Sequence, residues 1–278
     1  MVSIYQFFYS LVHHRKEFLR IEKLEDFPFD RNLLSCRNKG VFPDLVLRVS
    51  REGGQISGGE MIELKDNKTY SISSFNSTIP SAKKSLSALI SSENSKIIKQ
   101  MRESGEDPFE LPERDVYYLI RGRRKESPHL KVCLVHGHFF ETVKIEELIK
   151  QAFSQVLSEG LSSTDNIPLS EETIEKILSI LSRQEYFRKV RDVEQSSVKL
   201  RFRIMTEAKA EANILDSERY PQVKDDTLNL IVPFTNVIEK EQTIAKVQGV
   251  FGEEFNQLSQ TVIKHPFNGN FLLFQIEL

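Results

Sequence analysis

The sequence is poor in cysteine and has no long apolar run. Its two cysteines, Cys36 and Cys133, lie far apart and provide neither a disulfide framework nor a CxxC metal pair. A reducing, intracellular compartment fits this cysteine usage. No apolar run approaches the roughly 20 residues that a membrane span requires. The basic residues near the N-terminus follow the apolar segment VSIYQFFYSLV, whereas in a signal peptide they precede it. We therefore expect a cytoplasmic protein without a membrane partner.

The motifs of several functional classes are also missing. The sequence has no Walker-type phosphate loop and no GxSxG elbow, so nothing indicates an ATP-driven motor or a serine hydrolase, and no nucleotide cofactor is expected. The segment His136-Gly137-His138 lies near Cys133, but no second ligand pair follows at the spacing that zinc sites use. Strand packing explains these histidines better than a structural metal.

The composition is that of an ordinary folded protein. Of the 278 residues, 28% are charged and 39% are hydrophobic, a balance typical of globular domains. The length suits one large domain or two modest ones. The formal net charge of −2 does not exclude binding to nucleic acid, because basic residues can gather on one surface.

Hydrophobic periodicity predicts alternating helices and strands. For the first 160 residues we expect helix, strand, strand, helix, strand, strand and helix at 3–24, 42–49, 60–65, 81–102, 116–121, 130–140 and 143–157. The Gly-rich segment 50–59 is expected to join the first two strands as an antiparallel hairpin. After the polar segment LSSTDNIP we expect a helix at 170–183, a strand at 228–234, a helix within 239–264 and a C-terminal strand. The sequence thus predicts an α/β fold, with a mixed central sheet flanked by helices in residues 1–160 and an α+β region in residues 161–278.

The predicted hairpin carries a cluster of charged residues. Side chains alternate faces along a strand, so Glu63 and Lys65 point the same way, while Ile62 and Leu64 point into apolar packing. The hairpin brings Asp44 beside Glu63 if the register is right. Two carboxylates can hold Mg²⁺, which usually takes one or two protein carboxylates together with phosphate oxygens. An adjacent lysine can orient a water molecule or stabilise charge on phosphorus. Such a cluster is suited to hydrolysing a phosphodiester.

Each motif on its own is weak, and their combination carries the hypothesis. The acid-x-Lys pattern occurs three times, beginning at Glu63, Asp66 and Glu207, which is no more than chance predicts. The Pro-Asp dipeptide occurs once, at Pro43-Asp44. The first triplet, however, ends a predicted strand, and Pro-Asp begins the strand before it. The plain alternative is a turn residue at Asp44 and a solvated strand face at Glu63 and Lys65.

The segment PDLVLRV…GGEMIELK resembles the PD-(D/E)xK core of the restriction-endonuclease-like superfamily, and with the polar loop and helix that follow it is most similar to type II restriction endonucleases. The resemblance covers roughly residues 1–150, and residues 160–278 resemble nothing specific. It implies that Asp44 and Glu63 are Mg²⁺ ligands and that Lys65 is the catalytic lysine. An additional acid from the preceding helix would be Glu17 or Glu22. It further implies Mg²⁺-dependent cleavage of double-stranded DNA at a specific site, leaving 5′-phosphates.

The resemblance also favours a homodimer, because a two-fold symmetric protein matches a palindromic site. The C-terminal region would then serve DNA recognition or dimerisation. A nuclease of this kind also needs phosphate contacts for affinity and base contacts for sequence choice.

Two segments are candidates for the contacts with DNA. The loop and helix start that follow Lys65 offer donors to phosphates or base edges, namely Asn67, Lys68, Ser73, Ser74, Asn76, Lys83 and Lys84. The basic turn between the third and fourth strands offers Arg121, Arg123, Arg124 and Lys125. A second basic cluster between Arg188 and Arg203 has a solvated face as its plainer explanation. For the two candidate segments, too, the alternatives are a plain surface loop and a solvated hairpin tip.

Two other functions remain open at this point. A structure-selective or repair nuclease of the same fold would cut branched DNA and ignore linear duplex. A non-enzymatic DNA-binding or interaction protein would keep its activity after Lys65→Ala.

Overall fold

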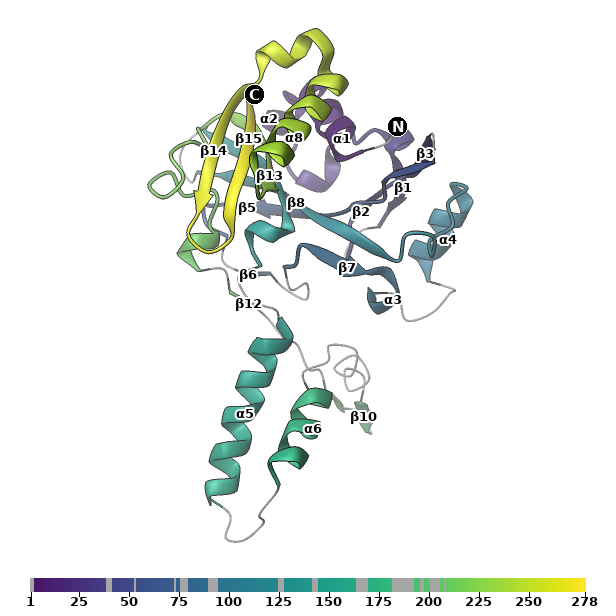
Figure 1. Ribbon diagram of the computed structural model, residues 1–278. Helices are drawn as coiled ribbons and strands as arrows, with labels where there is room; N and C mark the ends of the chain where they lie inside the picture. The colour runs from purple at the N-terminus through teal and green to yellow at the C-terminus, as the bar shows by residue number, and fades with distance from the viewer. Residues whose placement is uncertain are drawn as a thin grey trace. The chain divides into compact units, whose positions relative to one another are not determined.

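The computed structural model (Figure 1) describes residues 3–38, 42–52, 54–72, 74–75, 80–89, 95–124, 128–141, 145–163, 170–181, 193–195, 198–200, 206–207 and 209–278. The chain divides into two compact units. The first consists of Met1–Ser74, Pro80–Glu141 and Glu207–Leu278, and the second of Phe75–Ile79 and Thr142–Thr206. Among the described helices, none is both long and apolar enough to cross a membrane.

A nine-stranded mixed sheet forms the centre of the first unit, in the order β1-β2-β5-β8-β9-β13-β15-β14, with β7 paired to β8. The pairs β5–β8 and β9–β13 are parallel, and the others are antiparallel. The strands are β1 (Leu34–Arg37), β2 (Leu45–Leu47), β5 (Met61–Asn67), β7 (Lys83–Ser85), β8 (Glu113–Arg123), β9 (Leu130–His136), β13 (Thr227–Phe234), β14 (Ser259–His265) and β15 (Gly269–Glu277). The predicted α/β class with a mixed sheet and flanking helices is confirmed.

The C-terminal strands belong to this same sheet. β13 lies parallel to β9, with Leu230 beside Leu134, and β15 then pairs with β13. All four strands that follow β8 in the sheet order therefore share one core, although residues 142–206 separate three of them from β9 in the sequence. The domain boundary predicted after residue 160 does not match this arrangement, because strand pairing over such a separation leaves no local signal in the sequence.

Two helices cover one face of the sheet, α1 (Ile4–His13) and α8 (Val237–Phe251), as Figure 1 shows. α1 begins at Ile4 because the Ser3 side chain accepts a hydrogen bond from the backbone N–H of Gln6. Its apolar stripe is buried, and Phe8 packs against Phe251 at a ring-centroid distance of 5.8 Å. The amphipathic pattern predicted from the sequence therefore marks a true core face.

The helix predicted over 3–24 is shorter than expected. After α1 come a single turn, α2 (Glu17–Arg20), and the 3-10 helix η1 (Leu24–Asp26). Ile21 has extended backbone, with ψ of 142°. Arg121 accounts for this break, because its guanidinium donates to the carbonyls of Phe18 and Ile21 at 3.1 Å. Those carbonyls are thereby held toward the sheet, and the chain leaves the helix.

The opposite face carries shorter elements. The helices there are α3 (Leu86–Leu89), α4 (Lys96–Glu103) and η3 (Gly137–Phe139), and the 3-10 helix η2 (Arg31–Leu33) precedes β1. The helix predicted over 81–102 is thus replaced in part by β7, which pairs with β8, and residues 90–94 lie outside the described residues. η4 (Ala210–Ala212) and η5 (Gly252–Gln257) complete the first unit.

The second unit contains α5 (Ile145–Ser163) and α6 (Glu171–Leu181), which are joined by an ion pair of 2.9 Å between Lys150 and Glu175. β10 (Val193–Gln195) pairs with β11 (Val198–Leu200). Where the chain passes from one unit to the other, β6 (Ser74–Phe75) pairs with β12 (Thr206–Glu207).

The predicted hairpin is present and has more structure than a turn. Its outer part forms a ladder of β3 (Val49–Glu52) and β4 (Gln55–Gly58), in which Val49 faces Gly58. Gly59, with φ of 82°, then redirects the chain into β5. A Cβ atom there would lie 2.8 Å from a Leu111 methyl group, so both backbone conformation and space favour glycine. The segment expected as a ten-residue turn is therefore mostly strand.

Glu60, just before β5, holds the start of α1 to the sheet. Its Oε1 accepts a hydrogen bond of 3.1 Å from the backbone N–H of Ile4. Its Oε2 is buried and has no hydrogen-bond partner among the described residues. Glu60 lines a cavity of about 990 Å³ together with Tyr5 and Asp115. Burial raises the pKa of Glu60 to about 7, and the Asp115 carboxylate adds to the rise, while the Ile4 N–H and Arg114 oppose it.

This carboxyl group makes stability depend on pH. Its folded-state pKa lies above the ordinary value of 4.5, so the folded protein holds a proton that the unfolded chain releases, and stability falls as the pH rises between these values. We expect Glu60→Gln to match the wild type near about pH 4 and to exceed its free energy of unfolding by up to about 3 kcal/mol at about pH 8. Urea unfolding at both pH values measures this difference. Glu113→Gln, an exposed residue of the same cavity, is the control, and an equal gain in both variants would contradict the role of Glu60.

Candidate active site

The β2–β5 register places Asp44 directly opposite Glu63. Leu45 pairs with Ile62 and Val46 with Met61, so the next position along this ladder joins Asp44 and Glu63. The contact is reinforced from the backbone, because the N–H of Leu64 donates to Asp44 Oδ2 at 2.9 Å. The carbonyl of Asp44 in turn accepts from the N–H of Asn38 at 2.8 Å. The sequence analysis placed Asp44 beside Glu63 only if the strand register was right. The structure has this register, and the N–H groups of Leu64 and Asn38 hold Asp44 from both neighbouring strands.

Glu63 and Lys65 point to the same face of β5, as strand alternation predicts. The Lys65 ammonium Nζ donates to Glu63 Oε1 at 2.9 Å. The two side chains are 10% and 17% exposed, so neither is the freely solvated group of the plain alternative. On the neighbouring strand Tyr118 lies beside Glu63 in the sheet and is fully buried. Tyr118 thus shields one side of the cluster from solvent.

The two carboxylates are in direct contact. The Asp44 and Glu63 side chains share a hydrogen bond, and the pKa of Asp44 is raised to about 7. Burial is the largest cause, the negative charge of Glu63 adds to it, and Lys65 opposes it. Two acids held together in this way cannot both ionise at low cost. Such pairs are typical of sites that bind cations or transfer protons.

The chemistry of the donor set suits a hard divalent cation. Asp44 and Glu63 are close enough to share one ion, and bringing a cation between them would relieve the repulsion that raises the pKa of Asp44. Among the described residues, no group of three or more His, Cys, Asp and Glu side chains is arranged to hold a metal. A metal at Asp44 and Glu63 would therefore complete its coordination with water, backbone or substrate oxygens, as Mg²⁺ commonly does.

The acids considered as further ligands lie elsewhere. Glu17 pairs with Arg20 at 3.0 Å, and the carbonyl of Glu22 accepts from Arg121 at 3.0 Å. The charged side chains that influence Asp44 are Glu63 and Lys65. Neither Glu17 nor Glu22 is brought to this carboxylate. The histidines of the 136–138 segment also have local roles, since the His136 ring accepts from the N–H of His138 at 3.2 Å.

Arg121 is not available to DNA, and the prediction that it contacts DNA is wrong. Its side chain is fully buried on the face opposite Glu63. It makes a bidentate pair with Asp66, with Nε–Oδ1 and Nη2–Oδ2 distances of 2.9 and 2.6 Å. Asp66 also accepts from the N–H of Leu24 at 2.9 Å. The second acid-x-Lys triplet therefore supplies a structural acid, and the arginine of the basic turn anchors the N-terminal segment.

The other basic residues of this turn lie in different environments. Arg123 donates to the carbonyl of Ile21 at 3.2 Å and also contacts that of Glu22, so it extends the role of Arg121. Arg124 is exposed at the end of β8. Lys125 lies outside the described residues. An exposed arginine at the hairpin tip remains a candidate for contact with DNA.

The loop after Lys65 is only partly described. Asn67 is half-buried at the end of β5 and shares the face of Lys65, while Lys68 is exposed. Lys84 lies over the ring of Phe42 at 4.3 Å, which brings β7 next to the segment that leads to Asp44. Lys83 is 3.9 Å from Asp115, and Ser74 lies in β6. Two further predicted contacts, Ser73 and Asn76, lie outside the described residues.

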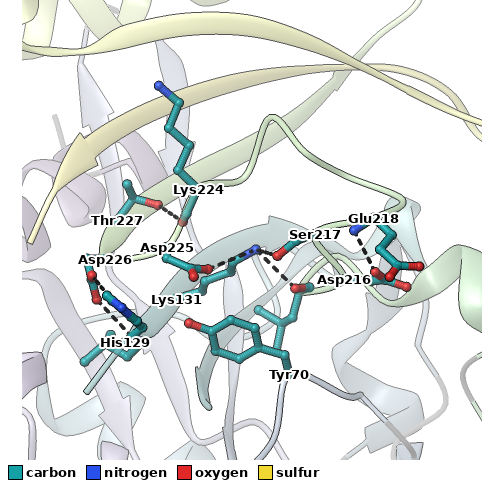
Figure 2. Close-up of polar contacts among 12 residues, drawn as sticks. Tyr70, His129, Lys131, Asp216, Ser217, Glu218, Lys224, Asp225, Asp226 and Thr227 are labelled. Atoms are coloured by element: carbon teal, nitrogen blue, oxygen red, sulfur yellow. Dashed lines mark hydrogen bonds and ion pairs between the residues drawn. The ribbon is translucent and has the colours of Figure 1, made fainter. Parts of the chain in front are cut away.

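A second cluster of charged residues surrounds Lys131 on β9 (Figure 2). The ammonium is fully buried and donates to Ser217 Oγ at 2.8 Å and to the carbonyl of Leu215 at 3.2 Å. Asp225 lies 3.6 Å away, and the Tyr70 ring centroid 5.2 Å away. Burial lowers the pKa of Lys131. Its contacts with Leu215, Ser217 and Asp225 tie the segment before β13 to the sheet, so we interpret this cluster as an anchor.

Sequence reasoning missed the neutral and backbone partners of the site. Asn38, which is buried, holds Asp44 through its backbone, and Tyr118 borders Glu63. Arg37 lines a small hollow together with Asn38 and Asp44. Only the pairing of β1, β2, β5 and β8 brings these residues to the site, and this pairing cannot be read from the sequence.

Comparison with known proteins gives no further assignment. The chain matches no protein-family model, no curated protein and no solved structure.

Proposed function

We propose that this protein is a Mg²⁺-dependent endonuclease of the PD-(D/E)xK kind that cleaves double-stranded DNA at a specific sequence, as type II restriction endonucleases do. The observation that carries the proposal is the contact of Asp44 with Glu63 beside the ammonium of Lys65. The order of α1, β2, β5, α4 and β8 also supports it, since these elements follow the helix–strand–strand–helix–strand pattern of the resemblance, to which the chain adds β1 and other short elements. Because such sites are commonly palindromic, we include a homodimer in the proposal.

The residues of the site have distinct roles in this proposal. Asp44 and Glu63 hold the cation, and Leu64 and Asn38 fix the position of Asp44 through backbone hydrogen bonds. Bound Mg²⁺ would supply the positive charge that polarises the scissile phosphate. Lys65 is held by Glu63 at 2.9 Å, so that its ammonium can orient the attacking water and stabilise the negative charge that develops on the phosphoryl oxygens.

Incubation of the purified protein with plasmid and phage DNA tests this function. We expect discrete, reproducible fragments in Mg²⁺ and intact DNA in EDTA, with 5′-phosphate ends that a ligase can rejoin. A protein with Lys65→Ala, purified in parallel, shows whether a contaminating nuclease is responsible. A smear would indicate non-specific cleavage, cutting restricted to branched DNA would indicate a structure-selective nuclease, and intact DNA of every kind would contradict the proposal.

A further inference from the structure

Three arginines surround a hollow at the β1 edge of the sheet. Arg31 on η2, Arg37 on β1 and Arg48 just after β2 line a cavity of about 420 Å³. The rest of its lining comes from the backbone and small side chains of β1 and from the end of α4, where Glu103 is the one acid. An excess of positive charge therefore faces this hollow.

These guanidinium groups are not committed to ion pairs within the described residues. Arg48 donates its Nε to the carbonyl of Leu34 at 3.2 Å, and Arg37 contacts the carbonyl of Glu25 and lies 5.4 Å from the Phe29 ring centroid. Both contacts are with backbone carbonyls and not with carboxylates, so they orient the guanidinium without neutralising it. The fully buried Arg121, by contrast, is paired with Asp66, and Arg114 with Glu106 at 2.7 Å.

The hollow is linked to the candidate active site through Arg37. The same side chain lines the small hollow that contains Asp44 and Asn38. On β1, Arg37 pairs with Leu45, the residue that follows Asp44. Arg37 therefore lies beside Asp44 at the β1 edge of the sheet, where the backbone of a polyanion bound at the site can pass.

We propose that Arg31, Arg37 and Arg48 bind a backbone phosphate of the same DNA strand whose scissile phosphate lies at Asp44, Glu63 and Lys65. This inference rests on the proposed function and identifies part of its DNA surface. The planar guanidinium fork matches phosphate oxygens in a bidentate manner, and arginine remains charged at every working pH. A contact of this kind contributes affinity and register and reads no base.

DNA binding without cleavage tests the proposal. The assay is fluorescence anisotropy of a labelled duplex taken from the plasmid of the cleavage assay, with Ca²⁺ in place of Mg²⁺, at several salt concentrations. We expect the double variant Arg31→Gln/Arg48→Gln to raise Kd by about tenfold or more and to reduce the slope of log Kd against log salt by about 1, since it loses the contact with one phosphate. Arg31→Lys/Arg48→Lys should retain most of the slope, because the charges remain.

The matched control is Arg20→Gln/Arg102→Gln, which removes the same net charge from exposed positions of α2 and α4. It should leave Kd within about twofold of the wild type. The proposal would be overturned if the two double variants lost the same DNA affinity, or if Arg31→Gln/Arg48→Gln left the salt slope unchanged. It would also be overturned by a wild type that does not bind duplex DNA. A wild type that binds with the expected slopes but never cleaves would remove the proposed nuclease activity and leave the phosphate site standing.

Discussion

Replacing Lys65 by alanine is expected to reduce DNA cleavage by about 10²–10³-fold or more while the protein remains folded. The ammonium lies 2.9 Å from Glu63 and lowers the pKa of Asp44, so its loss removes the group that would stabilise charge at the phosphate. Asp44→Asn and Glu63→Gln should lower cleavage to a similar extent, because each removes a carboxylate ligand for the cation. Initial rates of cleavage at saturating Mg²⁺ measure the loss.

The stability of these variants shows whether the cluster of Asp44, Glu63 and Lys65 serves catalysis or the fold. Burial and the neighbouring Glu63 penalise the charge of Asp44, so Asp44→Asn should be at least as stable to heat as the wild type at about pH 8. Lys209→Ala is a suitable control, since Lys209 belongs to another acid-x-Lys triplet and is exposed. Full cleavage by Lys65→Ala would remove Lys65 from the site. A large loss of thermal stability in Asp44→Asn would indicate that the cluster serves the fold.

Arg121→Met should cost the protein about 2–4 kcal/mol of folding free energy, because the Glu22 carbonyl and the partly exposed Asp66 carboxylate lose their charged donor. Arg121 also donates to the carbonyls of Phe18 and Ile21, so the variant additionally frees the chain between α1 and β1. Chemical denaturation measures the loss. Methionine keeps the volume of the side chain, and the effect is therefore due to the lost polar contacts.

The control for this prediction comes from the same basic turn. Arg124→Met removes an exposed arginine at the end of β8 and should change stability by no more than about 0.5 kcal/mol. If Arg121→Met were as stable as Arg124→Met, the contacts of Arg121 would not be the anchor that we infer. A large loss of DNA affinity in a fully stable Arg121→Met protein would restore the original prediction that Arg121 contacts DNA.

The basic residues show where sequence reasoning stops. Arg121, Arg123, Arg124 and Lys125 form the densest basic run near the predicted core, and the pattern favours a DNA contact. The structure turns Arg121 inward to Asp66. Arg31 and Arg48 are scattered in the sequence and gave no signal, yet they meet at one hollow. The number of positive charges is visible in the sequence, but their internal partners are not.

The sequence by itself determined what depends on local periodicity. The apolar stripe of α1 and the common face of Glu63 and Lys65 follow from helix and strand geometry over a few residues. The tertiary structure alone decided that Asp44 lies opposite Glu63, that Arg121 is buried, and that β13, β15 and β14 extend the central sheet. The physical reason is that register and burial arise from hydrogen-bonded pairs and packing between distant segments, whereas side-chain alternation arises from the backbone of each segment alone.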